Sequence, residues 1–230
     1  MHADLFHYFI PGTSQDGLKR FQRDLANRLG KLGLTEKETI VVYESRFGMR
    51  AARVAWMLEY AGASRVFLLE GGFQEWEKAR FPVGKRLNSP EPSVFHVRPV
   101  PRLLATAQQV LSSRSGTILD VRSSGEFKGT EGRECDTRKG RIPRAKWLEW
   151  KSFVQNGDKF KAPSQIGNIL YQKGLNKNKE VITYCHRGAR AAAAYYALRS
   201  LGYRNVRNYI GSWHEWSAWR ELPIERDWHA

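Results

Sequence analysis

The sequence is poor in cysteine and has no long apolar run. Its two cysteines, Cys135 and Cys185, do not form a CxxC pair, and no cysteine or histidine spacing matches a metal-binding motif. A disulfide framework or a zinc site is therefore not expected, and the thiols favour a reducing compartment, so we predict a cytoplasmic protein. No run of 18 apolar residues occurs, so we expect neither a membrane span nor a membrane partner. Met1–Asp4 lacks the basic start of a secretory signal.

Acidic side chains are scarce in the second part of the chain. Residues 93–230 hold 24 Lys and Arg against 12 Asp and Glu, whereas residues 1–92 hold 14 against 11. This excess is either a solvated basic surface or a positive field that gathers anions toward the second part. A nucleic-acid partner is less favoured but not excluded, because no zinc finger, RNP aromatic pattern or long basic run accompanies the charge.

An internal repeat organises the chain. Val41–Trp76 aligns without a gap to Val181–Trp216, at an offset of 140 residues, and 11 of the 36 aligned positions are identical. A single pair of copies does not make a solenoid, which needs at least three units. The chain therefore contains two copies of one domain.

Each copy has the same order of local signals. A short apolar run, Ile40–Tyr43 or Val181–Tyr184, predicts a buried strand, and an alanine-rich stretch predicts the helix that follows. A second apolar run and a short helix carrying Trp76 or Trp216 complete the unit. Strand, helix and strand in this order predict an α/β fold with a parallel sheet flanked by helices in each domain.

The domain boundary is predicted in the segment Asn88–Ser93, which has the composition of a linker. We therefore expect domains at 1–92 and 93–230. The second domain has an additional predicted strand, Thr117–Arg122, whose counterpart would fall before Met1. The first domain is thus expected to be shortened at its N-terminus, either because the sequence is truncated there, the interpretation we favour, or because the domain is degenerate.

The candidate chemical site is the loop Cys185–Arg190, between a predicted strand and a predicted helix. Free amides in the first helical turn, the helix dipole and two arginines favour the thiolate of Cys185 over the thiol. The same groups form a cradle for an anion, which suits attack on a small anionic substrate. Gly188 lets the loop curl without a Cβ clash. Taken alone, a cysteine after a buried strand is more often an inert core thiol.

Four ordered motifs in this chain resemble those of the rhodanese superfamily. They are Leu119–Arg122, Gly140–Ala145, Cys185–Arg190 and Gly211–Trp216, and Glu70–Trp76 repeats the last motif in the first half. Two tandem domains with an active C-terminal copy resemble the thiosulfate and mercaptopyruvate sulfurtransferases. The resemblance therefore implies two tandem rhodanese-like domains.

The resemblance also implies roles for single residues. Cys185 takes up sulfane sulfur as a persulfide, and the amides of His186, Arg187, Gly188, Ala189 and Arg190 stabilise its charge. Arg187 matches the basic residue that binds the sulfonate in thiosulfate-preferring members. Asp120 supports the loop from the strand behind it, and Arg122 holds either the loop or the substrate. Trp213 and Trp216 are expected in the core.

Two positions depart from the family pattern. Tandem members often carry a substrate-contacting arginine where this chain has Glu126, whose carboxylate opposes an anion. Arg187 and Arg190 therefore compensate, or the substrate differs. Arg144 replaces a usual glycine and is expected to alter only a turn. The Cys-x4-Arg spacing from Cys185 to Arg190 favours sulfur over phosphate, because related phosphatases use a loop one residue longer.

Three side chains near the predicted chemistry are not expected to take part in it. Ser45 stands where the second copy has Cys185, so the first domain is expected to be catalytically silent and to cover the active face of the second. An anion-binding regulatory site is the alternative there. His186 is expected to face solvent rather than to shuttle protons. Cys135 is expected to be an exposed thiol without a role, the alternative being a second sulfur acceptor or a redox partner of Cys185.

The sequence thus predicts a thiosulfate sulfurtransferase that needs no cofactor. Its partners are a small anionic sulfur donor, thiosulfate or 3-mercaptopyruvate, and a thiol or protein sulfur acceptor. Thiosulfate is favoured because the loop is basic. The alternatives are a phosphatase-like enzyme, a non-catalytic rhodanese-type binding module, and a sulfur carrier for tRNA or cofactor thiolation.

Overall fold

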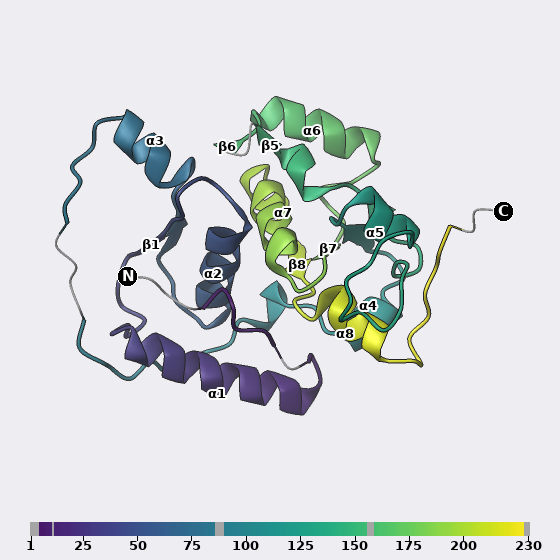
Figure 1. Ribbon diagram of the computed structural model, residues 1–230, viewed down its shortest axis with the longest axis horizontal. Helices are drawn as coiled ribbons and strands as arrows, with labels where there is room; N and C mark the ends of the chain where they lie inside the picture. Colours follow the sequence, from purple (N-terminus) through teal and green to yellow (C-terminus); the bar gives the residue numbers. More distant parts are fainter. Residues whose placement is uncertain (1–4, 11, 86–89, 156–158, 228–230) are drawn as a thin grey trace.

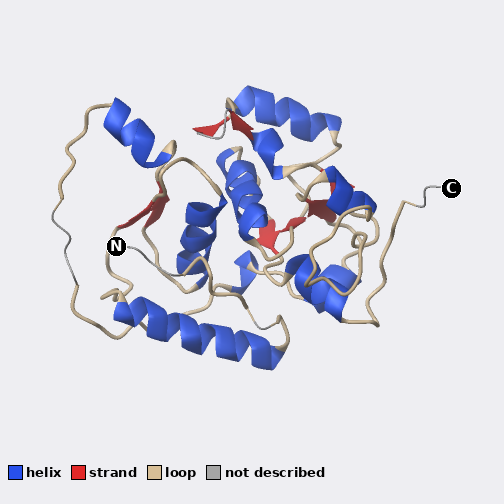
Figure 2. Ribbon diagram, viewed as in Figure 1, coloured by secondary structure: helices blue, strands red, loops and turns tan. Residues whose placement is uncertain are grey.

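The computed structural model describes residues 5–10, 12–85, 90–155 and 159–227. The first half contains α1 (Gln15–Lys31), β1 (Ile40–Val42), α2 (Met49–Tyr60), β2 (Val66–Leu68) and α3 (Gly72–Lys78). The second half begins with η1 (Pro101–Leu103), α4 (Ala107–Ser112), β3 (Thr117–Asp120), α5 (Ser124–Lys128), β4 (Lys146–Trp147) and η2 (Trp150–Phe153). It continues with β5 (Val154–Gln155), β6 (Lys159–Phe160), α6 (Pro163–Gln172), β7 (Val181–Tyr184), α7 (Ala189–Ser200), β8 (Val206–Asn208) and α8 (Ser212–Ala218). Figures 1 and 2 show the two halves side by side.

The predicted repeat is confirmed by the positions of the helices and strands. The bounds of α7, β8 and α8 are those of α2, β2 and α3 shifted by 140 residues. In both copies the two strands pair in parallel, β1 with β2 and β7 with β8. The α/β fold with parallel sheets flanked by helices is therefore as predicted.

The two sheets differ in size. The second half has a four-stranded parallel sheet in the order β4-β3-β7-β8, whereas the first half, in its described residues, has only β1 and β2. The strand predicted at Thr117–Arg122 is β3, which pairs along the full length of β7. Val41 and Phe67 of the smaller sheet are 53% and 56% exposed, whereas every residue of β7 is buried.

The two halves share a hydrophobic core. The central helices α2 and α7 pack against each other (Figure 1), and their apolar side chains belong to one buried cluster. Helix α1 adds the stripe Phe21, Leu25 and Leu29, whose spacing of four residues places all three on one helix face. The second half is therefore buried against the first along α7.

A second cluster confirms the packing role predicted for two tryptophans. Trp213 and Trp216 on α8 are 1% and 0% exposed and pack with Tyr184 and Tyr209. The backbone of Arg144, expected to lie in a turn where the family has glycine, has φ 63°, the left-handed region that glycine favours.

The predicted linker lies partly outside the described residues, because Asn88 and Ser89 are not among them. The chain after it packs on the first half: Ser93 N–H donates to Gly30 O, and Val100 N–H donates to Tyr60 O, both at 2.9 Å. The boundary between 92 and 93 stays a prediction. No helix in the described parts of the chain is long and apolar enough to cross a membrane.

Candidate active site

Cys185 lies between the buried strand β7 and the first turn of α7, as predicted. Its side chain is almost inaccessible, since the residue is 1% exposed. The backbone N–H of Gly188 donates to Cys185 Sγ at 3.1 Å. The predicted site residue Ala189 begins α7, and amides in a first helical turn have no partner within the helix. The thiol is thus held at the positive end of a helix of 12 residues.

Gly188 is required by the shape of this loop. Its φ of 81° is in the left-handed region. A Cβ at this position would meet Ile210 at 2.8 Å from a side-chain carbon and 3.0 Å from Cα. A larger residue would therefore push the loop away from Ile210, in the segment between β8 and α8.

Hydrogen bonds from the β8–α8 region fix the loop from the other side. Cys185 N–H donates to Ser212 Oγ at 3.1 Å, and Trp213 N–H donates to Cys185 O at 3.0 Å. His214 N–H donates to His186 O at 3.0 Å, and the Asn208 amide donates to Gly188 O at 3.2 Å. These contacts preorganise the loop backbone.

Asp120 and Arg122 lie behind the loop as a buried pair. Their side chains are 0% and 1% exposed, and Arg122 Nη2 lies 2.6 Å from Asp120 Oδ2. Arg122 also donates to Gly140 O at 2.8 Å and stacks on Trp213. The Tyr184 hydroxyl donates to Asp120, and burial together with that carboxylate raises the pKa of Tyr184 well above its ordinary value. Arg122 therefore contacts the Gly140 segment and α8 rather than the Cys185 loop itself, and its role in holding the loop or the substrate stays a prediction.

Arg190 and Glu126 form a bidentate ion pair. Two guanidinium nitrogens of Arg190 lie 2.6 and 2.8 Å from the two Glu126 oxygens. Burial acts to raise the pKa of Glu126, but the hydrogen bond and charge of Arg190 outweigh it and lower that pKa to about 2. Glu126 thus neutralises the last arginine of the loop, rather than acting alone against an anion.

Arg53 of α2 reaches the loop from the first half. This side chain is 0% exposed, and its guanidinium donates to Arg187 O and, at 2.7 Å, to Tyr8 O. Burial lowers the pKa of Arg53 to about 10, an effect that the charge of Cys185 opposes. Arg53 is therefore a buried cation within electrostatic range of the thiol.

The Arg187 side chain points away from the core of the loop. Its guanidinium lies over the Phe9 ring at 4.6 Å, and Arg53 lies over the same ring at 4.8 Å. Arg187 Nη2 is also 3.3 Å from His214 Nε2. Phe9, Arg187 and His214 line one cleft beside the loop. The N-terminal segment of the first half therefore forms part of the wall next to Arg187.

The expectation that His186 faces solvent is wrong. Its side chain is 6% exposed, and Nε2 lies 2.8 Å from Asp136 Oδ1. The loop that carries Asp136 packs over His186 and removes it from water. Cys135, the neighbour of Asp136, is exposed as expected, and its Sγ lies 3.8 Å from His186 Nε2.

In the corresponding loop of the first half, the side chain of Glu44 occupies the amides at the start of the helix. Ser45 is exposed, and the carboxylate of Glu44 accepts hydrogen bonds from the backbone N–H groups of Arg50 and Ala51, at 3.1 and 3.0 Å. Phe47 from this loop packs on Phe160 of the second half. Because Glu44 caps the helix internally, the alternative of an anion site in this loop loses support.

Sequence reasoning did not identify Arg53 and Glu44. The repeat contains a signal for each: Arg53 aligns with Ala193, so it is a charge within an apolar helix pattern, and Glu44 aligns with Tyr184. A charged residue in one copy, where the other copy has an apolar or aromatic residue, marks where their environments differ.

Comparisons with known proteins agree with this geometry. A family model described as Rhodanese-like domain matches residues 9–79 and 103–218. The chain is 29% identical over 221 residues to a thiosulfate sulfurtransferase of Pseudomonas aeruginosa, covering 91% of this chain and 78% of that protein. It is 28% identical to the sulfur carrier protein TtuD of Thermus thermophilus, covering 89% and 77%.

A solved structure has a similar fold. The enzyme EanB, in a complex with ergothioneine covalently linked to a persulfide, superposes with a TM-score of 0.79 at 26% identity. The match covers 91% of this chain and 56% of that one, so the present chain spans little more than half the length of EanB. The tandem repeat, the Cys185 loop and these relatives together establish that the chain belongs to the rhodanese family of sulfurtransferases.

Proposed function

We propose that this chain transfers sulfane sulfur from thiosulfate to a thiophilic acceptor through a persulfide on Cys185. The observation that carries the proposal is the hydrogen bond of 3.1 Å from Gly188 N–H to Cys185 Sγ at the start of α7. A sulfur atom that accepts an amide hydrogen bond at a helix N-terminus is stabilised as an anion, both as a thiolate and as a persulfide.

The reaction has two steps, and in each step one bond to the transferred sulfur forms as another breaks. The Cys185 thiolate attacks the outer sulfur of thiosulfate, the S–S bond of the donor breaks, and sulfite leaves with the bonding electron pair. The acceptor, cyanide in an assay or a thiolate in the cell, then attacks the outer sulfur of the persulfide and releases the Cys185 thiolate. No electron donor or cofactor enters either step, because sulfur is passed between nucleophiles.

Two buried cations lie within electrostatic range of Cys185. The charges of Arg53 and Arg190 both interact with that of Cys185. Arg190 is already paired with Glu126, whereas Arg53 has no acidic partner among the described residues and adds a positive charge near Cys185. Asp120 and Arg122 act as positioning residues. Arg122, paired with Asp120, donates to Gly140 O and lies over the Trp213 ring of α8.

Thiosulfate is favoured over 3-mercaptopyruvate as the donor because the loop side chains are basic. We assign the sulfonate to Arg187, whose guanidinium lies at the cleft beside the loop. The oxygen atoms of a sulfonate suit the donor fork of a guanidinium, and the amides of His186 to Arg190 line the path of the transferred sulfur.

A second candidate function is that of a sulfur carrier. The relative of Thermus thermophilus carries that name, and residues 93–230 have a net charge of +12, which favours an acidic partner. A carrier would form the same persulfide but would deliver it to a protein or an RNA instead of to cyanide. A salt-sensitive shift of tRNA on a gel would support the RNA form of this candidate.

Peptide mass spectrometry tests the proposal. The reduced protein is incubated with thiosulfate or 3-mercaptopyruvate, digested, and compared with the Cys185→Ser variant. We expect one added sulfur on the peptide that contains Cys185, removed by cyanide and absent from the variant. Folded protein with a titratable thiol and no added sulfur from either donor would sink the proposal and favour a non-catalytic binding module.

A further inference from the structure

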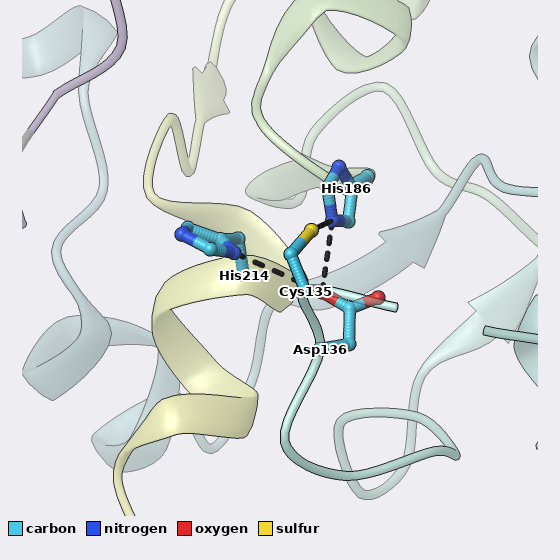
Figure 3. A group of neighbouring side chains, drawn as sticks. All are labelled: Cys135, Asp136, His186 and His214. Atoms are coloured by element: carbon cyan, nitrogen blue, oxygen red, sulfur yellow. Dashed lines mark hydrogen bonds and ion pairs between the residues drawn. The ribbon is translucent and has the colours of Figure 1, made fainter. Parts of the chain in front are cut away.

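Four residues with metal-binding side chains lie together beside the candidate active site. The reaction proposed above uses none of these side chains. They are Cys135, Asp136, His186 and His214 (Figure 3). One donor atom from each lies within 4.8 Å of all the others. The residues come from three separate segments: the loop before Gly140, the loop after β7, and helix α8. Their spacing in the sequence therefore gives no metal-binding motif.

We propose that these four residues form a binding site for a divalent transition metal of the Zn²⁺ type. A thiolate, two imidazoles and a carboxylate are the donor set that Zn²⁺ takes, whereas Mg²⁺ and Ca²⁺ prefer oxygen alone. The Cys135 thiol loses its proton on binding, and the hydrogen between His186 Nε2 and Asp136 moves to the other imidazole nitrogen or to solvent, so that Nε2 can donate its electron pair.

The distances between the donor atoms suit one shared ion. Donors bound at ~2.0–2.3 Å from a tetrahedral zinc are about 3.3–3.8 Å apart. Cys135 Sγ lies 3.8 Å from His186 Nε2, and Asp136 Oδ1 lies 3.8 Å from His214 Nδ1. Asp136 Oδ1 and His186 Nε2 are closer, at 2.8 Å, and the ion would replace the proton between them.

One donor atom in the cluster is otherwise unused. His214 Nδ1 is buried and has no hydrogen-bond partner among the described residues. A buried polar atom without a partner costs free energy, so such an atom calls for an explanation. It faces Asp136 across the cluster, as the dashed line in Figure 3 shows. A cation placed between these groups would satisfy it.

The protein holds the donor-bearing segments rigidly. The Arg138 guanidinium donates at 2.9 Å to Trp216 O, Ser217 O and Leu222 O, which ties the loop carrying Cys135 and Asp136 to the α8 region. His214 N–H donates to His186 O, which ties that helix to the catalytic loop. The backbone that carries the donors is therefore held in place, while exposed Cys135 leaves the site open to solvent on one side.

Arg187 opposes a bound cation. Its Nη2 lies 3.3 Å from His214 Nε2 and 3.9 Å from Cys135 Sγ. A guanidinium at this distance repels a divalent ion, so metal binding must move the Arg187 guanidinium away from Cys135 and His214. Replacement of Arg187 by an uncharged residue should therefore tighten metal binding, a result that a purely structural cluster would not give.

Zinc titration of the reduced full chain tests the proposal by calorimetry, with Co²⁺ absorption as a second readout. We expect one equivalent of Zn²⁺ with a dissociation constant below about 1 µM, and a thiolate-to-Co²⁺ charge-transfer band. Cys135→Ser and His214→Ala should each weaken binding roughly 100-fold or more, and Arg187→Met should strengthen it.

Two control variants make the result specific. His96→Ala removes a histidine of the second domain's leading segment, and Cys185→Ser removes the other thiol, and neither should change zinc affinity. Zinc should also raise the melting temperature of the wild type but not of the folded Cys135→Ser variant. The proposal is overturned if no binding occurs below about 10 µM, or if Cys185→Ser abolishes binding while Cys135→Ser leaves it intact.

Discussion

The two halves contain the same loop and helix, but different groups accept hydrogen bonds from the amides at the start of the helix. In the second half, the start of α7 presents an amide to the sulfur of Cys185. In the first half, the amides at the start of α2 are taken by the carboxylate of Glu44. Position 44 corresponds to position 184, where Tyr184 turns away to Asp120. The residue before the nucleophile position thus separates a self-capped helix from one that can stabilise a reacting sulfur.

Exchange of the two nucleophile-position residues should have the largest effect. Cys185→Ser is expected to abolish persulfide formation and thiosulfate–cyanide transfer, because a hydroxyl cannot carry sulfane sulfur. Ser45→Cys in that background should not restore either, because Glu44 already occupies the helix amides. Mass spectrometry of both thiol peptides checks this. An added sulfur on the peptide that contains position 45 would show that the loop of the first half can also carry a persulfide.

Loss of Arg53 should have the next largest effect. Arg53→Met leaves Arg187 O and Tyr8 O without this buried donor, so the free energy of unfolding should fall by about 2–3 kcal/mol. Persulfide formation should slow as well, because a cation near Cys185 is lost. Urea unfolding and single-turnover kinetics measure the two effects. Arg50→Met, an exposed change on the same helix, is the control, and equal losses in both variants would contradict the role of Arg53.

The two loop glycines should respond differently to alanine. Gly188→Ala places a Cβ in the left-handed region and against Ile210, so unfolding free energy should fall by about 1–2 kcal/mol and activity with it. Gly48 has extended backbone, and the atoms nearest to its Cβ would be those of the flexible Glu44 carboxylate, so Gly48→Ala should cost less. Denaturation of both variants decides the matter, and a larger loss for Gly48→Ala would be the opposite result.

Glu126→Gln should produce the smallest change, visible mainly in pH dependence. The folded-state pKa of Glu126 is lowered to about 2, so its ion pair with Arg190 stabilises the fold above the ordinary carboxyl pKa. This contribution is lost as pH falls from about 5 to 2, and Glu126→Gln should remove that part of the acid sensitivity.

The same variant frees Arg190 to attract an anion. We therefore expect the KM for thiosulfate to fall about threefold at neutral pH, a modest gain because the pair is partly solvated. Urea unfolding across this pH range and steady-state kinetics give both readouts. An unchanged acid transition, or a raised KM, would show that Glu126 does not control Arg190.

The sequence predicted the repeated elements well because they depend on local patterns. Apolar runs and the alanine-rich stretches placed β7, α7 and their counterparts, and the loop motif identified Cys185. The partners of that loop were harder to find, because they come from distant segments. Arg53 lies 132 residues before Cys185 in the chain, and Asp136 turned the expected solvent-facing His186 into a buried side chain. Only the packing of α2 and of the Cys135 loop reveals them.

The contact of Arg53 with Arg187 O makes the two halves interdependent. The first copy has Ser45 at the nucleophile position, yet its helix α2 supplies a cation to the loop of the other copy. A substitution of Arg53 should therefore be felt at Cys185, although the two residues belong to different halves. The first half is thus part of the environment of Cys185 as well as a neighbouring domain.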